Sequence, residues 1–177
     1  MGRLDAASTG LLLLTSDGRV PNAVLRASAS KSKVYRVVSG PGRVTDAHLE
    51  ALRTGVVITT VAQRDGRRAA PLVAPTQPCE VVRIGAGGGA TSGRELRITL
   101  KEGRNRQIRR MLGALGYETV SLHREQFMSV TLDELTEGGW RVLREKEMRG
   151  VRTAVREAAR ARAAAAGGAA EADDEEE

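Results

Sequence analysis

The 177-residue sequence contains 28 Lys and Arg residues against 22 Asp and Glu residues, and 41% of its residues are hydrophobic. A single cysteine excludes an internal disulfide framework and a Cys-based zinc cluster, and no apolar run approaches the ~20 residues of a membrane span. Residues 1–170 carry 28 basic and 16 acidic residues, a net charge of +12, which favours a polyanionic partner such as RNA, DNA or an anionic membrane.

The first half of the sequence predicts short strands and helices separated by turn residues. An apolar run over 10–15, closed by a Ser-Asp-Gly turn, is typical of a buried strand, and the alternation over 33–39 is typical of a half-buried one. Capping residues place the helix ends. In chain order we expect a strand over 10–15, a helix over 22–27, a strand over 33–39, a helix that begins after Thr45 or Asp46 and ends at Gly55, and a strand over 56–61.

The second half predicts a hairpin, two helices and two further strands. Residues 62–77 read as a loop with short extended pieces, and the glycine-rich stretch 85–93 as a flexible connection. The last ten residues are acidic and of low complexity, so we expect them to be disordered. In chain order we expect paired strands over 80–84 and 95–100, a helix from about 106 to 115 with Asn105 as its N-cap, strands over 119–123 and 140–143, and an Ala/Arg-rich helix over 146–166.

These elements follow one another without a regular βαβ alternation. The predicted fold is therefore α+β, with a mixed, mainly antiparallel sheet and flanking helices. Only four residues are aromatic, so the core must be largely aliphatic, and an aromatic side chain in a polar motif calls for an explanation.

The basic segment 101–112 carries the clearest functional pattern. It places Arg104 and Arg106 at the start of the expected helix, where cations oppose the helix dipole, and a bound phosphate would account for them. Arg109 lies at the edge of the apolar stripe of that helix, where a half-buried guanidinium needs a carboxylate or several carbonyl partners. The alternative is a solvated basic face from which Arg109 extends its charge to water.

Two other positions also allow a functional interpretation. Asp5 precedes the first expected strand and is either a turn residue or a carboxylate kept ionised by an arginine such as Arg109, in which case it can act as a nucleophile without metal or cofactor. Tyr35 lies between Lys33 and Arg36 and is either an ordinary strand residue or a ring on which an unpaired base stacks. The two histidines have no acidic cluster beside them, so we expect no metal site.

Four ordered motifs resemble the RsuA/RluB/RluE/RluF-type pseudouridine synthases, which modify uridines in ribosomal RNA. The family motif Gly-Arg-Leu-Asp, followed by Gly-Leu-Leu-Leu-Leu-Thr-x-Asp-Gly, is matched at 2–5 and 10–18, with Ser8 in place of the usual threonine. The other three motifs are Lys-x-Tyr-x-Val at 33–37, Glu-Gly-(Arg/Lys)-Asn-Arg-Gln-(Ile/Val)-Arg-Arg-Met at 102–111 and Leu-x-Arg at 122–124.

The resemblance implies a central RNA cleft on this α+β fold and an isomerase that converts uridine to pseudouridine in ribosomal RNA, with no cofactor and no metal. Asp5 would be the nucleophile on a flipped uridine, Tyr35 would stack on the uracil and help to remove its C5 proton, and Arg109 would pair with Asp5. Leu122 would pack under the base. The residues implied to bind RNA or substrate are Arg3, Lys33, Arg104, Asn105, Arg106, Gln107, Arg110, Leu122 and Arg124.

The resemblance spans residues 2–147 and implies a catalytic domain over 1–147, with an added helix and acidic tail over 148–177. The strand and the S4-type domain that precede the first motif in the family do not appear before it, so we expect an N-terminally truncated chain. Met128 stands where the family has glycine. The alternative function is that of a non-catalytic RNA-binding fragment of such an enzyme. We expect a monomer without membrane association, in the cytoplasm or in the stroma of a plastid or mitochondrion.

Overall fold

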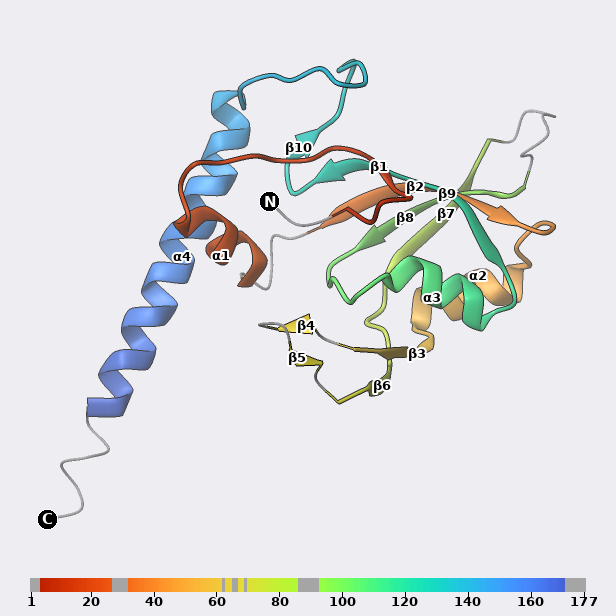
Figure 1. Ribbon diagram of the computed structural model, residues 1–177, viewed down its shortest axis with the longest axis horizontal. Helices are drawn as coiled ribbons and strands as arrows, with labels where there is room; N and C mark the ends of the chain where they lie inside the picture. Colours follow the sequence, from red (N-terminus) through yellow and green to blue (C-terminus); the bar gives the residue numbers. More distant parts are fainter. Residues whose placement is uncertain are drawn as a thin grey trace, which may run out of the picture.

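A six-stranded sheet forms the centre of the structure (Figure 1). The structure is a computed structural model that describes residues 4–26, 32–61, 63–64, 67–68, 70–85 and 93–170. The strand order is β1-β9-β2-β8-β7, and β10 pairs with β9 outside this path. Among these strands β1 alone runs parallel to its neighbour, which confirms the predicted α+β fold with a mixed, mainly antiparallel sheet. The strands are β1 (Thr9–Gly10), β2 (Lys33–Gly40), β7 (Glu80–Ile84), β8 (Glu95–Leu100), β9 (Glu118–Phe127) and β10 (Val130–Thr131).

The central strand β2 follows from the alternation that predicted it. Val37 is fully buried and lies opposite Leu122 of β9 and Leu96 of β8. Successive side chains of a strand point to opposite faces of the sheet, so Val37 faces the core and its neighbour Arg36 faces the other side. On the other face, Arg36 forms an ion pair of 2.8 Å with Glu95. The predicted hairpin is confirmed as β7 and β8, whereas residues 86–92 of the glycine-rich connection lie outside the described part of the chain.

Two helices, α2 (Asp46–Thr54) and α3 (Gln107–Ala114), pack against one face of the sheet. Both helices were predicted from the sequence. In each, the apolar residues recur at helical spacing and so form one side of the helix, which packs against the strands. The first core cluster that they form with the sheet is aliphatic, as expected. Its fully or almost fully buried members are Val37, Val44, Leu49, Leu52, Val56, Ile58, Val81, Leu96, Ile98, Leu100, Ile108, Met111, Leu112 and Leu122.

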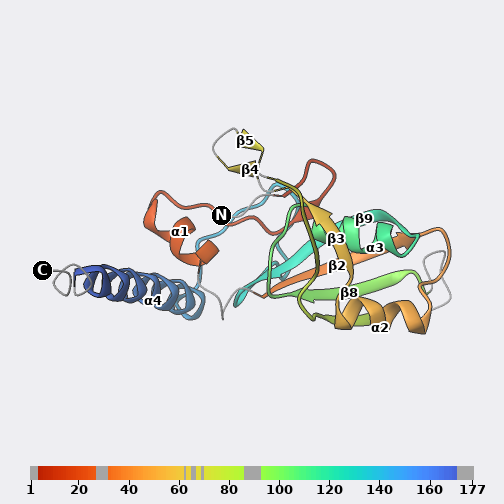
Figure 2. The ribbon, with the colours of Figure 1, turned by 90° about the horizontal axis from the view of Figure 1, so that it is seen from below.

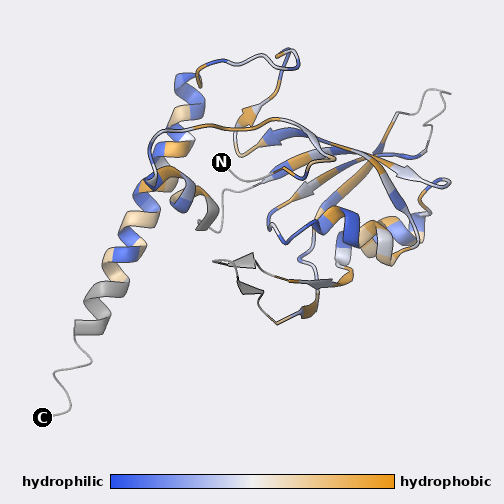
Figure 3. Ribbon diagram, in the orientation of Figure 1, coloured by the Kyte–Doolittle hydropathy of each residue, from blue (hydrophilic) through white to orange (hydrophobic). Residues whose placement is uncertain are grey.

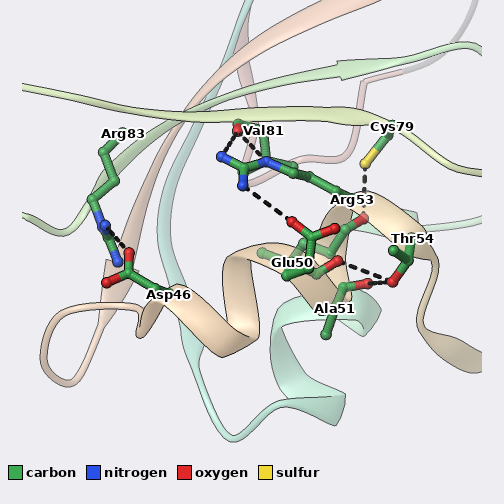
Figure 4. A network of polar contacts seen from close by, with 9 residues as sticks. Asp46, Glu50, Ala51, Arg53, Thr54, Cys79, Val81 and Arg83 are labelled. Carbon is green, nitrogen blue, oxygen red and sulfur yellow. Dashed lines mark hydrogen bonds and ion pairs between the residues drawn. The ribbon is translucent and has the colours of Figure 1, made fainter.

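Polar contacts join α2 to the strand β7 beside it (Figure 4). Arg53 donates two hydrogen bonds to the carbonyl of Val81, at 2.8 and 3.0 Å, and the Cys79 thiol donates to the carbonyl of Leu52. Burial raises the pKa of the partly buried Cys79 thiol to about 11, so the protonated thiol is its main form at neutral pH. The hydroxyl of Thr45 accepts a hydrogen bond from the backbone N–H of His48 and caps the helix, as the sequence predicts.

The segment over 62–77 contains short extended pieces, as the sequence predicts. Its strand β6 (Leu72–Pro75) pairs with β3 (Val57–Thr60), and the two-residue strands β4 (Gln63–Arg64) and β5 (Arg67–Arg68) pair with each other. These pairs form two small sheets apart from the main one.

A second core cluster lies where α1 (Arg19–Arg26) packs against α4 (Glu145–Ala170), beside the end of β9. Figure 2 shows that α4 extends from this cluster away from the sheet. The buried members of the cluster are Leu11, Leu13, Val24, Phe127, Met128, Val130 and Ala154. Met128 has a φ of +55°, a conformation that glycine adopts freely, which accounts for the glycine of the related motif at this position.

The predicted strand over 10–15 is wrong beyond its first residue. Strand pairing with β9 ends at Gly10, and the chain then continues in an extended conformation without a partner strand. Leu11 and Leu13 are buried in the second cluster, whereas Leu12 and Leu14 are exposed. The apolar run therefore reflects packing against α1 and α4 on one side only.

Two further predictions need correction near the C-terminal end. Residues 140–143 form no strand: Trp140 and Val142 are exposed and Leu143 packs against the second cluster. The predicted helix over 146–166 is confirmed, but α4 continues to Ala170 and includes the start of the expected tail. Residues 171–177 lie outside the described part of the chain, in which no helix is long and apolar enough to cross a membrane.

The start of α4 is fixed by a network around one buried carboxylate. Glu147 accepts hydrogen bonds from both terminal nitrogens of Arg141, each at 2.8 Å, and from the backbone N–H of Arg144 at 2.7 Å. Asp133 forms ion pairs with the same two arginines, at 3.8 and 2.9 Å. The hydrogen bonds from Arg141 lower the pKa of Glu147 to about 2.

We expect Glu147→Gln to lower the free energy of unfolding by about 2 kcal/mol at pH 7. A carboxyl group whose pKa is lower in the folded than in the unfolded state stabilises the fold above its unfolded pKa, and this contribution disappears as the pH falls towards about 2. Urea unfolding from pH 7 to pH 2.5 should therefore show a smaller loss of stability in the variant than in the wild type. Glu137→Gln, at an exposed position, is the control, and equal pH profiles for all three proteins would contradict the prediction.

Gly10 brings β1 into unusually close contact with β9. Its φ is +102°, and a Cβ atom added to it would lie 2.3 Å from the backbone oxygen of Arg124. We expect Gly10→Ala to destabilise the protein by about 2–4 kcal/mol, because both the clash and the backbone conformation oppose a side chain. Gly18→Ala, where no atom lies within 4 Å of the added carbon, should change the unfolding midpoint little.

Candidate active site

Asp5 lies in a tight turn immediately before β1. Its backbone carbonyl accepts a hydrogen bond of 2.9 Å from the N–H of Ser8, and the chain then enters the parallel pairing with β9. The hydroxyl of Thr9 lies 2.8 Å from Nδ1 of His123 and adds a side-chain contact between the same two strands. The Asp5 side chain is 36% exposed, so the carboxylate is accessible to a ligand although its backbone is fixed.

Arg109 of α3 connects this turn to the sheet. Its terminal nitrogens donate to the carbonyl of Ala7 at 2.7 Å and to the carbonyl of Thr119 at 3.2 Å. Its Nε is buried, has no hydrogen-bond partner and lies 3.8 Å from Oδ2 of Asp5. The structure thus pairs Asp5 with Arg109, whose own side chain is only 14% exposed.

A second cation approaches the same carboxylate oxygen. Nε of Arg106 lies 4.0 Å from Oδ2 of Asp5, and the Arg106 side chain is 57% exposed. Arg106, and not the predicted Asn105, is the N-cap of α3, with a left-handed φ of +50° and no side-chain capping bond. The side chain of Asn105 instead accepts a hydrogen bond from Arg110 at 3.3 Å.

Tyr35 of β2 lies beside these charges. It is opposite Arg124 of β9, just after a register shift between Val34 and Tyr35, and packs at the edge of the first core cluster. Burial raises the pKa of the Tyr35 hydroxyl, the nearby Arg124 guanidinium lowers it, and the Asp5 carboxylate adds to the increase. The net direction of the pKa shift is upward, so Tyr35 is a neutral phenol at physiological pH.

Arg124 and Leu122, expected to contact RNA, are buried instead. Arg124 is 2% exposed, donates two hydrogen bonds to the carbonyl of Leu11 at 2.6 and 2.8 Å, and lies over the ring of Phe127 at 5.6 Å. In the structure this guanidinium is occupied by contacts within the protein, so the expected RNA contact of Arg124 stays a prediction that its burial does not favour. Leu122 is 8% exposed and belongs to the first core cluster.

Arg104 and Gln107 also have internal partners. Glu102 accepts hydrogen bonds from Nε of Arg104 at 3.0 Å and from the Gln107 amide at 2.7 Å. Arg104 further donates to the backbone carbonyls of Ala74 and Pro75 on β6. These contacts shape the loop before α3, and they account for Arg104 at the helix start without a bound phosphate.

The remaining predicted positions lie at the rim of the site or outside the described residues. Nζ of Lys33 donates to the carbonyl of Glu102 at 3.2 Å, and Arg110 contacts Asn105, which is exposed. Arg3 lies outside the described part of the chain.

Sequence reasoning missed the central role of Glu102. This residue accepts the bonds that organise the loop, and its Oε1 also accepts one from the backbone N–H of Gln77 at 2.8 Å. The available signal was that Glu102 is the single acid within the basic segment 101–117. An isolated carboxylate among arginines predicts an internal ion-pair partner.

The site therefore offers an accessible carboxylate, two cations beside it and one flanking phenol. A carboxylate this accessible can act as a nucleophile, while the exposed Arg106 remains available for an anionic ligand. Within the described residues, no three His, Cys, Asp or Glu side chains are grouped so as to hold a metal ion.

Comparisons with known proteins show which family the chain resembles. A family model described as RNA pseudouridylate synthase matches residues 1–114. The chain is 35% identical over 151 residues to the dual-specificity RNA pseudouridine synthase RluF of Salmonella typhi, covering 84% of this chain and 44% of RluF. It is 38% identical over 146 residues to the ribosomal large subunit pseudouridine synthase E of Vibrio vulnificus, covering 79% of this chain and 58% of that protein.

A crystal structure of a pseudouridylate synthase gives the same result for the fold, with a TM-score of 0.67 at 30% identity over 85% of this chain and 57% of that one. The chain belongs to the RNA pseudouridylate synthase family, and its resemblance to the RsuA-type members is confirmed. It spans about half the length of the curated relatives that it matches.

Arg109→Ala should lower the free energy of unfolding by about 2–3 kcal/mol, because two carbonyls lose their donor and Asp5 loses its buried partner. Arg110→Ala, one position along the same helix, removes contacts to Asn105 only and should cost less than about 0.5 kcal/mol. Urea unfolding of both variants is the measurement. Equal stabilities would show that Arg109 does not connect the turn to the sheet.

Proposed function

We propose that the chain isomerises uridine to pseudouridine in ribosomal RNA, with Asp5 as the nucleophile on a flipped uridine. The observation that carries the proposal is the Asp5 carboxylate, accessible at 36% and lying 3.8 Å from Arg109 and 4.0 Å from Arg106. A structural turn residue would not need two arginines around an accessible oxygen. Membership of the family supports the same chemistry.

The reaction balances within the substrate. The bond between ribose C1′ and uracil N1 breaks, the uracil rotates, and a bond between C1′ and uracil C5 forms. C5 loses a proton and N1 ends with one, so no co-reactant is consumed. The Asp5 carboxylate forms a transient bond to ribose C1′ or to the base and is released when the new carbon–carbon bond is complete.

The other residues of the site take supporting roles. Arg109 lies beside the Asp5 carboxylate and holds the turn that carries it, while Arg106 is exposed enough to contact the phosphate beside a flipped nucleotide. Tyr35, a neutral phenol, stacks on the uracil. Tyr35 is also the candidate for taking the C5 proton, for which its phenol must first lose its own proton: burial opposes that charge and the nearby Arg124 guanidinium favours it.

Two observations support ribosomal RNA as the substrate. Relatives at 38% and 34% identity are named as ribosomal large subunit pseudouridine synthase E, of Vibrio vulnificus, and ribosomal small subunit pseudouridine synthase A, of Vibrio cholerae. In addition, residues 1–170 carry 28 basic and 16 acidic residues, a net charge of +12 that suits a phosphate backbone.

Asp5→Asn should abolish pseudouridine formation on ribosomal RNA, with a loss of at least about 10³-fold in rate, because the amide is not a nucleophile. RNA affinity, measured by fluorescence anisotropy, should stay unchanged or rise, since one negative charge is removed from a basic site. Asp46→Asn, an exposed position on α2, is the matched control and should keep full activity. A wild-type chain that binds RNA without forming pseudouridine would instead support the non-catalytic RNA-binding function.

A further inference from the structure

The helix α4 carries a row of arginines that the site around Asp5 does not use. Residues 148–164 contain five arginines and one acid, and all five arginines are exposed. At 100° per residue, Arg149, Arg156 and Arg160 lie within about 40° of one another around the helix axis, and Arg152 lies within about 60° of Arg149. We call these four residues the arginine row. In Figure 3, hydrophilic residues recur along this part of α4.

We propose that the arginine row is a second RNA-binding surface, which contacts the phosphate backbone of the RNA whose uridine enters the site at Asp5. The inference rests on the proposed function for the identity of the RNA, but the surface is separate from that site. The row spans about 16 Å along α4 from Arg149 to Arg160, so it suits an extended backbone and not a single anion.

The packing of α4 fixes which side of the helix faces outward. Val151 and Ala154, on the side opposite the row, are 5% and 1% exposed. Gly150 approaches the turn between β9 and β10 so closely that an added Cβ atom would lie 3.0 Å from the hydroxyl of Ser129. Glu147 is held by Arg141 in the network at the start of the helix. The row therefore lies on the side of α4 that faces solvent, opposite the packed residues.

The charges of the row are mostly unneutralised. Arg152 forms an ion pair of 2.8 Å with Glu145, at two exposed side chains where such a pair contributes little. For Arg149, Arg156 and Arg160, the described part of the chain contains no ion pair or side-chain hydrogen bond. Glu157, the one acid of this stretch, lies at the edge of the row, about 60° from Arg160. A line of free guanidinium groups is the electrostatic footprint of a nucleic-acid contact.

RNA fits this surface better than an anionic membrane does. A helix that binds a membrane surface buries a large apolar face in the lipid. The buried apolar residues of α4, Val151 and Ala154, face the protein, where α4 packs against α1, and apart from Val155 the other residues between the arginines are small or polar. Two separated contacts on one RNA also raise its overall affinity, because binding at one surface increases the local concentration at the other.

The test removes two charges from the row and two from elsewhere. Arg156→Gln with Arg160→Gln is compared with Arg43→Gln and Arg162→Gln, which lie at exposed positions outside the row. Glutamine and arginine have similar helix propensities, and circular dichroism checks that both double variants fold. The probe is a uridine-containing stem-loop RNA of about 40 nucleotides, and its affinity is measured by anisotropy between 50 and 200 mM salt.

We expect the row variant to bind this RNA about tenfold more weakly than the wild type. The fall of log K with log salt should also become less steep, by about 1–2 in slope. The control variant should change the affinity and the slope by less than half as much. Equal effects of the two double variants on RNA binding would overturn the proposal. So would a row variant that binds RNA as the wild type does but binds phosphatidylserine vesicles more weakly. Asp5→Asn separates the two proposals: if it retains activity while the row variant binds RNA weakly, the proposed nucleophile is wrong and the second surface stands.

Discussion

The buried guanidinium of Arg124 lies where the two core clusters and the site meet. It donates to the carbonyl of Leu11, while its own backbone carbonyl accepts from the N–H of the same leucine at 2.8 Å. It also lies over the ring of Phe127 and beside Tyr35. A cation this deeply buried must keep all of these partners, so the positions of β1, of the leucine segment after it and of Tyr35 all depend on it.

This arrangement divides the basic residues into two groups with different tasks. Arg104, Arg109 and Arg124 donate to backbone carbonyls and build the frame around the site. Arg106 and the arginine row of α4 keep their charge at the surface, where phosphates can reach it. Net charge alone therefore overstates the basic surface that faces RNA, because several guanidinium groups are already satisfied inside the protein.

Local patterns predicted most of the fold, since strand alternation and helix caps act over a few residues, as in β2 and at Thr45 of α2. Contacts between distant segments were harder to predict. The leucine run beyond Gly10 has the composition of a strand, but it packs against α1, which follows it directly, and against α4 and the end of β9, which lie more than 100 residues later. The pairing of Asp5 with Arg109 was anticipated, whereas the burial of Arg124 depends on the carbonyl of Leu11, which no side-chain pattern reveals.

The parallel pairing of β1 with β9 also has a consequence for synthesis of the chain on a ribosome. Thr9 contacts His123, 114 residues later, and Arg109 contacts Ala7 across 102 residues. The segment that carries Asp5 is made early but finds its neighbours only after β9 has emerged, and such distant contacts form late in folding. A growing chain thus exposes basic segments to RNA before the Asp5 carboxylate is in place, and the pairing of Asp5 with Arg109 and of β1 with β9 forms only after β9 has been translated.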